Sequence, residues 1–215
     1  MLRLELDHPT LGVGVVRAAP VSNGPSPAAL LDRIRAHEAA LRSGATAFPE
    51  LTRAAVRDVL RFGGYKPTGR GKPASEYLLG VATGDGMPAI SLLVDLNNLV
   101  SLRTGFPISI FDADLLGSDV SIRFGRPGES YVFNQAGHAM DLEGLPVVCR
   151  GDEPVGNAVK DSMACKVNPG TTAVVAVVYG TTRAVESSVA AAARLLSERL
   201  AEYAGATQVS VETLP

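Results

Sequence analysis

Cysteine, tryptophan and long apolar runs are scarce in this chain of 215 residues. It has two cysteines, Cys149 and Cys165, and no tryptophan. Neither cysteine has metal-ligand spacing or a histidine beside it, so we expect buried free thiols in a reducing compartment, with no metal and no cofactor. No apolar run approaches the ~18 residues that a membrane helix needs, and residues 1–10 lack the apolar core of a signal peptide. These absences predict a cytoplasmic protein that does not bind membranes.

A dominant charge of one sign is also missing. The chain has 20 Lys and Arg against 22 Asp and Glu, which gives a formal net charge of −2. This balance excludes attraction of the whole molecule to nucleic acid or membrane, so RNA binding requires a local basic patch. The hydrophobic content of 46% is enough for a sizeable core. We expect a single domain over residues 1–215.

Hydrophobic periodicity and turn residues predict the secondary structure. Strands are expected over residues 2–6 and 11–19, as a hairpin or a pair of strands. Further strands are expected over 88–94, 108–112, 119–124, 171–179 and 208–211, with two short strands within 140–150. Helices are expected over residues 27–42, 49–62, 73–83, 95–104 and 185–203. Because strands and helices interleave without a regular alternation, the pattern predicts an α+β fold with mainly antiparallel or mixed sheets flanked by helices.

The stretch from Pro88 to Asp112 carries polar residues among apolar ones. Asp95 is a candidate N-cap of the helix that follows, and Gly105 is its natural stop. Asn97 and Asn98 either hold backbone in place or face a ligand, because a buried polar group costs free energy unless it is hydrogen-bonded. Taken together, these side chains make this stretch a candidate wall of a binding cleft.

A second polar cluster lies between Pro154 and Lys166. Asn157, Lys160, Asp161 and Ser162 stand there beside apolar neighbours. Lys160 and Asp161 with the nearby serine would suggest a nucleophile and its base. Adjacent residues of an extended strand, however, point to opposite faces. The sequence therefore favours a loop that lines a pocket. Glu129, directly after Gly128, is either a turn carboxylate or a charged group at the mouth of a site.

The most basic segment runs from residue 53 to residue 72. Three of its arginines recur at spacings of four residues on one helix face, and a glycine-rich loop adds three more cations. The six side chains are Arg53, Arg57, Arg61, Lys66, Arg70 and Lys72. The segment is either a solvated helix face with a flexible loop, or a patch that grips phosphates.

The sequence VDLNNLVSLRTGFPISIFD, residues 94–112, resembles a known family. An aspartate in an apolar segment, a following asparagine, a helix ending in glycine, then a proline and a Phe-Asp pair are typical of the B3/B4 tRNA-binding (editing) domain of the phenylalanyl-tRNA synthetase beta subunit. The resemblance continues through Ile122-Arg123 and the turn GRPGE and covers about residues 57–180. It implies the α+β fold of that domain, with N-terminal strands and helices and a C-terminal helix added.

The resemblance implies binding of the acceptor end of tRNA, with an amino-acid moiety as ligand, and hydrolysis of the ester of a mischarged tRNA. A synthetic site cannot strongly reject an isostere with one more hydroxyl, so a second, hydrolytic site corrects the error. Two positions depart from the family pattern. Ser109 replaces a histidine, and Val159-Lys160-Asp161-Ser162 replaces a Gly-Gly-acid segment. We expect the pocket to persist with a changed polar lining and a changed ligand.

Two hypotheses follow. In the first, the protein is a trans-editing hydrolase in which Ser109, Lys160 and Asp161 carry the chemistry. The six cations of residues 53–72 would bind RNA, and the substrate would contact Asn97, Asn98, Glu129 and Asn157. In the second, it is a non-catalytic binding module for tRNA or a small amino-acid-like ligand.

Overall fold

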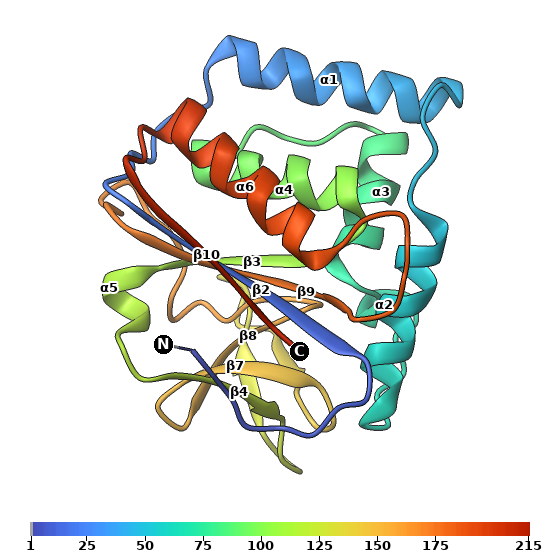
Figure 1. The fold of residues 1–215 in the computed structure, drawn as a ribbon, viewed down its shortest axis with the longest axis vertical. Helices are drawn as coiled ribbons and strands as arrows, with labels where there is room; N and C mark the ends of the chain where they lie inside the picture. The colour runs from blue at the N-terminus through green and yellow to red at the C-terminus, as the bar shows by residue number, and fades with distance from the viewer. Residues whose placement is uncertain (1) are drawn as a thin grey trace.

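The computed structural model describes residues 2–215 (Figure 1). Its helices are α1 (Ala28–Ser43), α2 (Glu50–Phe62), α3 (Ala74–Thr83), α4 (Leu92–Thr104), α5 (Ala113–Leu116) and α6 (Val189–Ala204), with a 3-10 turn η1 (Gly69–Gly71). Its strands are β1 (Arg3–Leu4), β2 (Leu11–Ala19), β3 (Ile108–Asp112), β4 (Val120–Phe124), β5 (Ser130–Val132), β6 (Ala139–Asp141), β7 (Pro146–Arg150), β8 (Glu153–Asn157), β9 (Val174–Thr181) and β10 (Gln208–Leu214).

The strands form two four-stranded sheets and one two-stranded ribbon. The first sheet has the order β10-β2-β9-β3 and is antiparallel throughout. The second has the order β1-β4-β7-β8, in which only β1 and β4 pair in parallel. Strands β5 and β6 form the ribbon. This arrangement confirms the predicted α+β class with antiparallel and mixed sheets flanked by helices.

The first sheet separates two hydrophobic clusters, and its strand β9 contributes to both. Val174, Ala176 and Val178 face the cluster on the helical side, whereas Val175, Val177 and Tyr179 face the cluster between the two sheets. This alternation is the period of two expected of a strand with both faces buried. Strand β3 lies at the edge of this sheet, and within residues 2–215 its outer edge pairs with no named strand and makes only an isolated antiparallel bridge, between Phe111 and Lys166.

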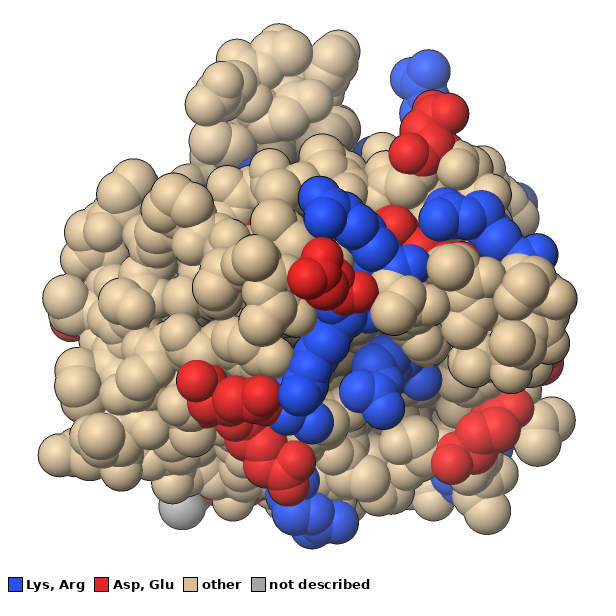
Figure 2. Space-filling model, turned by 90° about the horizontal axis from the view of Figure 1, so that it is seen from above, with Lys and Arg blue, Asp and Glu red and all other residues tan. Residues whose placement is uncertain are grey.

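The helices α4 and α6 cover one face of the first sheet, and α1 lies above them (Figure 1). On the face seen in Figure 2, basic and acidic side chains lie beside one another, and uncharged residues cover most of the surface. No helix within residues 2–215 has the length and apolar character needed to cross a bilayer.

The predicted helices near α1, α2, α3 and α6 are confirmed within a few residues, as are the strands near β2, β3, β4 and β9. The predicted strand over residues 88–94 is wrong. Residues 88–91 form an irregular loop, and α4 begins at Leu92 with Ser91 as its N-cap residue, so the cap assigned to Asp95 is wrong as well. The apolar run of Leu92, Leu93 and Val94 belongs to a helix that is buried on most of its surface. Such a helix lacks the polar face that identifies helices in sequence.

Of the two expectations for the N-terminal strands, the hairpin is wrong. Strand β1 joins β4 in the second sheet, whereas β2 joins β9 and β10 in the first. His8 makes the turn between them, because its Nδ1 accepts hydrogen bonds from the backbone amides of Thr10 and Leu11. Cys149 and Cys165 are buried free thiols, as predicted.

Candidate functional site

A cavity of about 1140 Å³ lies beside β3, the edge strand of the first sheet. It is bounded by the α3 and α4 helices, the loop 87–91 and the segment 159–169. Its walls are largely apolar, with Val81, Val94, Ile108 and Ile110 among the lining residues. A ligand cavity has typically about 300–1,000 Å³ and a few polar groups that orient the ligand, so this cavity can hold a ligand larger than one amino acid.

A carboxylate with two buried hydroxyls behind it lies at one end of the cavity. The Ser109 hydroxyl, which is 1% exposed, donates to Asp161 Oδ1 at 2.6 Å and lies 3.0 Å from the Tyr179 hydroxyl. Burial and the Asp161 carboxyl raise the pKa of the Tyr179 phenol well above its ordinary value, so this phenol stays protonated. Because Ser109 gives its proton to Asp161, Tyr179 must donate to Ser109. The three groups form one directed chain of hydrogen bonds.

The Asp161 carboxyl has an unusual pKa. Burial raises it from the ordinary value of 3.8 to about 7, although hydrogen bonds from Ser109 and the Asn157 amide lower it. Both of these bonds reach Oδ1. Within residues 2–215, Oδ2 makes no hydrogen bond, and Asp161 lines the cavity. A carboxyl that is about half ionised near pH 7, with one free oxygen, has the properties of a general acid or base.

The turn that presents Asp161 is held by Asn157, a buried residue at the end of β8. Asn157 Oδ1 accepts the backbone amides of Val159 and Lys160 at 2.7 and 3.1 Å, and its Nδ2 donates to the Tyr131 hydroxyl at 2.6 Å. The same hydroxyl donates to the Lys160 carbonyl oxygen. Asn157 itself does not line the cavity. Its bonds fix the backbone on which Lys160 and Asp161 are mounted.

Two lysines and an aromatic ring lie beside the carboxylate. The Lys160 ammonium lies 4.2 Å from the centre of the Phe133 ring, within the range of a cation–π contact. Lys166 Nζ donates to the Phe133 carbonyl oxygen at 3.0 Å. All three residues line the cavity, and neither lysine makes a salt bridge within residues 2–215. Positive charge at this end of the cavity is therefore available to an anionic or developing negative group.

Helix α4 supplies two amide side chains to the cavity. Asn97 donates from Nδ2 to the Ile108 carbonyl oxygen at 2.8 Å, whereas its Oδ1 is buried and has no hydrogen-bond partner within residues 2–215. The side chain of Asn98, one residue further on, is half-buried and makes no hydrogen bond within the same residues. An unpaired buried acceptor costs free energy. Asn97 Oδ1 is thus suited to a ligand donor such as an ammonium group.

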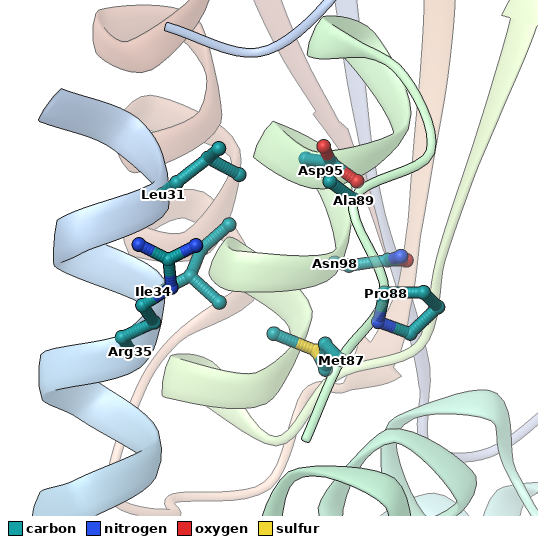
Figure 3. A pocket seen from close by; sticks show the side chains of 8 residues that line it. All are labelled: Leu31, Ile34, Arg35, Met87, Pro88, Ala89, Asp95 and Asn98. Carbon is teal, nitrogen blue, oxygen red and sulfur yellow. The ribbon is translucent and has the colours of Figure 1, made fainter. Parts of the chain in front are cut away.

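Asp95 fixes the loop that borders the cavity. It accepts the Ser26 hydroxyl at 2.6 Å and the Ile90 amide at 3.0 Å. A small cavity of about 50 Å³ lies behind this loop, between α1 and α4 (Figure 3). Figure 3 shows Leu31 and Ile34 of α1 directed toward the α4 helix across it. Six of its eight lining residues also line the large cavity, so the two are neighbouring parts of one hollow region.

The arginines of α2 are paired with acidic residues. Arg57 makes two hydrogen bonds of 2.5 Å to the buried Glu76 carboxylate of α3. Arg53 and Arg61 form ion pairs with Glu50 and Asp58 of their own helix, at 2.5 and 2.9 Å. None of the three lines the cavity. Arg70 and Lys72, in contrast, line it, whereas Lys66 is exposed and lies outside it.

Four predicted site residues therefore come together around the cavity, in addition to Arg70 and Lys72. They are Asn97, Asn98, Lys160 and Asp161. Ser109 and Asn157 lie behind this group and contact it through Asp161 and Lys160. Glu129 lies elsewhere, where it accepts two hydrogen bonds from Arg123 at 2.7 and 2.8 Å.

Sequence reasoning missed Tyr179, Tyr131 and Phe133. Tyr179 places a hydroxyl in an otherwise apolar central strand. This polar group was the one signal in the sequence that could have indicated Tyr179 as a site residue. Within residues 2–215, no group of three or more His, Cys, Asp or Glu side chains is placed to hold a metal ion.

Comparisons with known proteins give consistent matches. The model of the B3/4 domain family matches residues 68–204. The phenylalanine–tRNA ligase beta subunit of Bordetella pertussis is 38% identical over 69 residues, which cover 32% of this chain and 8% of the relative. The same subunit of Neisseria meningitidis serogroup A is 47% identical over 45 residues, covering 21% of this chain and 6% of the relative. The matched region is therefore less than a tenth of each relative's length.

Among solved structures, the chain is similar to an N-terminal fragment of the phenylalanyl-tRNA synthetase beta subunit from Pyrococcus horikoshii. The similarity has a TM-score of 0.45 at 14% sequence identity, and it covers 57% of this chain and 45% of that chain.

Proposed function

This chain belongs to the B3/4 domain family, and on this basis we propose that it is a trans-editing hydrolase that cleaves the ester of a mischarged aminoacyl-tRNA. The family match over residues 68–204 confirms the resemblance found in residues 94–112. The relatives that match are beta subunits of phenylalanine–tRNA ligase, which supports a function related to tRNA. Ester hydrolysis goes beyond what these relatives support, and the experiment below tests it.

The observation that carries the proposal is the Asp161 carboxyl at the end of the cavity. An aminoacyl ester is already activated, so the protein needs only to position a water molecule and stabilise the oxyanion. In our proposal Asp161 Oδ2 accepts a proton from the attacking water, and the water oxygen bonds to the ester carbonyl carbon. The bond between that carbon and the ribose oxygen then breaks, and the ribose oxygen takes the proton from Asp161 to become a hydroxyl. The products are a free amino acid and tRNA.

The neighbouring groups supply charge and orientation in this proposal. Lys160 or the Asn98 amide stabilises the carbonyl oxygen as it becomes negative. Asn97 Oδ1, unpaired and buried, accepts a hydrogen bond from the α-ammonium group of the substrate. Ser109 does not touch the substrate. It is a positioning residue that holds Asp161 and lowers the pKa of its carboxyl.

The test is deacylation of a panel of mischarged tRNAs. Asp161→Asn should lower the rate by about 10²–10⁴-fold, the usual contribution of a general base. The wild-type rate should rise with pH until about 7, the pKa of Asp161, and then level off. Ser109→Ala removes a hydrogen bond that lowers this pKa, so the rise should move to higher pH. Arg194→Ala, an exposed residue outside the cavity, is the control.

The alternative is a binding module without catalysis. It would be supported if the wild-type protein bound tRNA or an amino acid but cleaved no member of the panel. Equal deacylation by the wild-type protein and Asp161→Asn would contradict the proposed role of the carboxylate.

A further inference from the structure

Strand β10 forms an open edge of the first sheet. It pairs with β2 on one side, and within residues 2–215 no strand pairs with its other side. The strand has seven residues, and its register with β2 runs from Gln208 to Leu214 without a bulge. Natural proteins protect such an edge with a lysine, a proline or a bulge, because an open edge can pair with another strand. The strand sequence, QVSVETL, contains none of these protective features.

The other sheet edges are covered by the chain itself. On β3, a carbonyl oxygen accepts the Asn97 side-chain amide, and a backbone amide donates to the Cys165 carbonyl oxygen. On β8, at one edge of the second sheet, a carbonyl oxygen accepts the Ser162 backbone amide. Strand β1, at the other edge of that sheet, has only two residues. Among the strands within residues 2–215, β10 therefore has the longest uncovered edge.

The register shows which backbone groups of β10 point outward. The Thr182 amide donates to the carbonyl oxygen of Thr10, the residue before β2, so Thr10 bonds toward β9. Backbone groups of a strand alternate between its two neighbours, so every second residue of β2 after Thr10 also bonds to β9. The β10 residues opposite these positions are Val209, Val211 and Thr213. Their N–H and C=O groups therefore point away from the sheet, and they make no hydrogen bond within residues 2–215.

The same edge carries exposed apolar side chains. Val209 lies opposite Ala18, and Val211 lies opposite Val16. Both of these β2 residues belong to the hydrophobic cluster on the helical side. The two valines therefore lie on that side of the sheet, yet they are 37% and 38% exposed. A further strand at this edge would bury part of their surface, which favours association.

The edge of β10 is complementary to itself. If two copies pair in antiparallel orientation about a two-fold axis at Val211, Val211 lies opposite its own counterpart and Val209 lies opposite Thr213. Each of these pairs exchanges two backbone hydrogen bonds, and β-branched side chains directly opposite one another stabilise a sheet. Glu212 is the charged residue of the strand, and it pairs with Arg17 at 3.4 Å. In this register it lies opposite a serine of the second copy, so no like charges meet.

We propose that β10 is the interface of a homodimer, in which a second copy of this chain pairs through its own β10. The two four-stranded sheets then form one continuous sheet. The assembly closes at two copies, because the two-fold pairing uses both open edges and each remaining end is a covered β3 edge. Strands β10 and β3 lie at opposite edges of the first sheet, so the cavity beside β3 stays accessible in both copies. This proposal does not depend on ester hydrolysis.

The test is sedimentation velocity of the purified chain over a wide range of concentrations. The wild type should change with rising concentration from 22.4 kDa to twice that mass. Val211→Pro removes an outward N–H and places a ring at the edge, so this variant should remain at 22.4 kDa throughout. Val211→Thr keeps the N–H and the branched side chain, so its dissociation constant should stay within about 5-fold of the wild-type value.

Two charged variants test the register of the interface. Val211→Lys and Val211→Glu each place like charges opposite one another at the two-fold axis, so each variant alone should be monomeric. An equal mixture of the two should form a heterodimer, because unlike charges then meet. Leu51→Lys, which changes an exposed apolar residue of α2, is the matched control and should dimerise as the wild type does.

Urea unfolding at low protein concentration separates loss of pairing from loss of the fold. Val211→Pro should unfold near the wild-type midpoint, because the N–H that it removes makes no hydrogen bond in the monomer. Ser210→Pro is the matched control for the direction of the backbone groups. It should lower the midpoint, because the Ser210 N–H points toward β2.

The proposal is overturned if the wild type sediments as a monomer at every concentration, or as a species larger than a dimer. It also fails if Val211→Pro and Val211→Lys dimerise as the wild type does, because another surface would then form the dimer. If the mixed lysine and glutamate variants did not associate, the two-fold register at Val211 would be rejected, and this interface with it.

Discussion

The raised pKa of Asp161 predicts how the stability of the protein depends on pH. The folded protein keeps this proton up to a pH of about 7, whereas the unfolded chain releases it near the ordinary value of 3.8. Between these two values the folded state binds one proton more than the unfolded state. The free energy of unfolding contributed by Asp161 is therefore greatest below pH 3.8 and falls as the pH rises to about 7.

The size of the effect follows from the interval between these values. One proton changes the free energy of unfolding by at most about 1.36 kcal/mol per pH unit. Over about three pH units, the ionised Asp161 should cost about 4 kcal/mol. Asp161→Asn retains an oxygen that can accept the Ser109 hydroxyl and the Asn157 amide but does not titrate. The free energy of unfolding of Asp161→Asn minus that of the wild type should therefore increase from pH 4 to pH 7 and then remain constant.

The assay is urea unfolding, followed by circular dichroism, of both proteins at intervals between about pH 4 and pH 8. Asp85→Asn removes the same charge from an exposed loop and is the matched control for net charge. If the unfolding free energies of the wild type and Asp161→Asn ran parallel over this range, the Asp161 carboxyl would not have a raised pKa. The reasoning about its role as a base would then be refuted as well.

Three further substitutions test the surrounding structure by urea unfolding. Gly156→Ala should destabilise the fold by about 1–3 kcal/mol, because a Cβ there would lie 2.4 Å from the Phe111 ring. Asn157→Ala should cost about 2–3 kcal/mol, because it removes the bond to Tyr131 and leaves two backbone amides unpaired. Glu186→Ala should cost about 1 kcal/mol, because this carboxylate accepts the first backbone amides of α2, whereas Glu186→Gln should cost less.

Much of the fold could be predicted from the sequence, because most elements carry local signals. Helices α1 and α2 have an apolar face and follow a proline, and β9 is a continuous apolar run with both faces buried. The α4 helix is different. Ten of its residues, including polar Asp95 and Asn97, are buried, so its pattern has no solvent face. Its start could not be located without knowing what packs around it.

The candidate site could be predicted only where its residues are close in sequence. The pairs Asn97-Asn98 and Lys160-Asp161 were found because each is a local polar cluster. The hydrogen bond from Ser109 to Asp161 joins residues 52 positions apart, and no local pattern indicates it. Charge was equally hard to judge. From sequence, the arginines of α2 suited either a solvated helix face or an anion site, and only the fold shows that Arg57 pairs with an acid on the next helix.

The sharing of β9 between two hydrophobic clusters has a consequence for how the molecule opens. Residues of β9 alternate between the clusters, so the strand cannot separate from one without exposing the other. We expect no sub-global opening in which either cluster alone unfolds. The backbone amides of Val175 to Val178 should therefore exchange with deuterium only when the whole molecule unfolds, whereas those of the loop 87–91 should exchange much earlier.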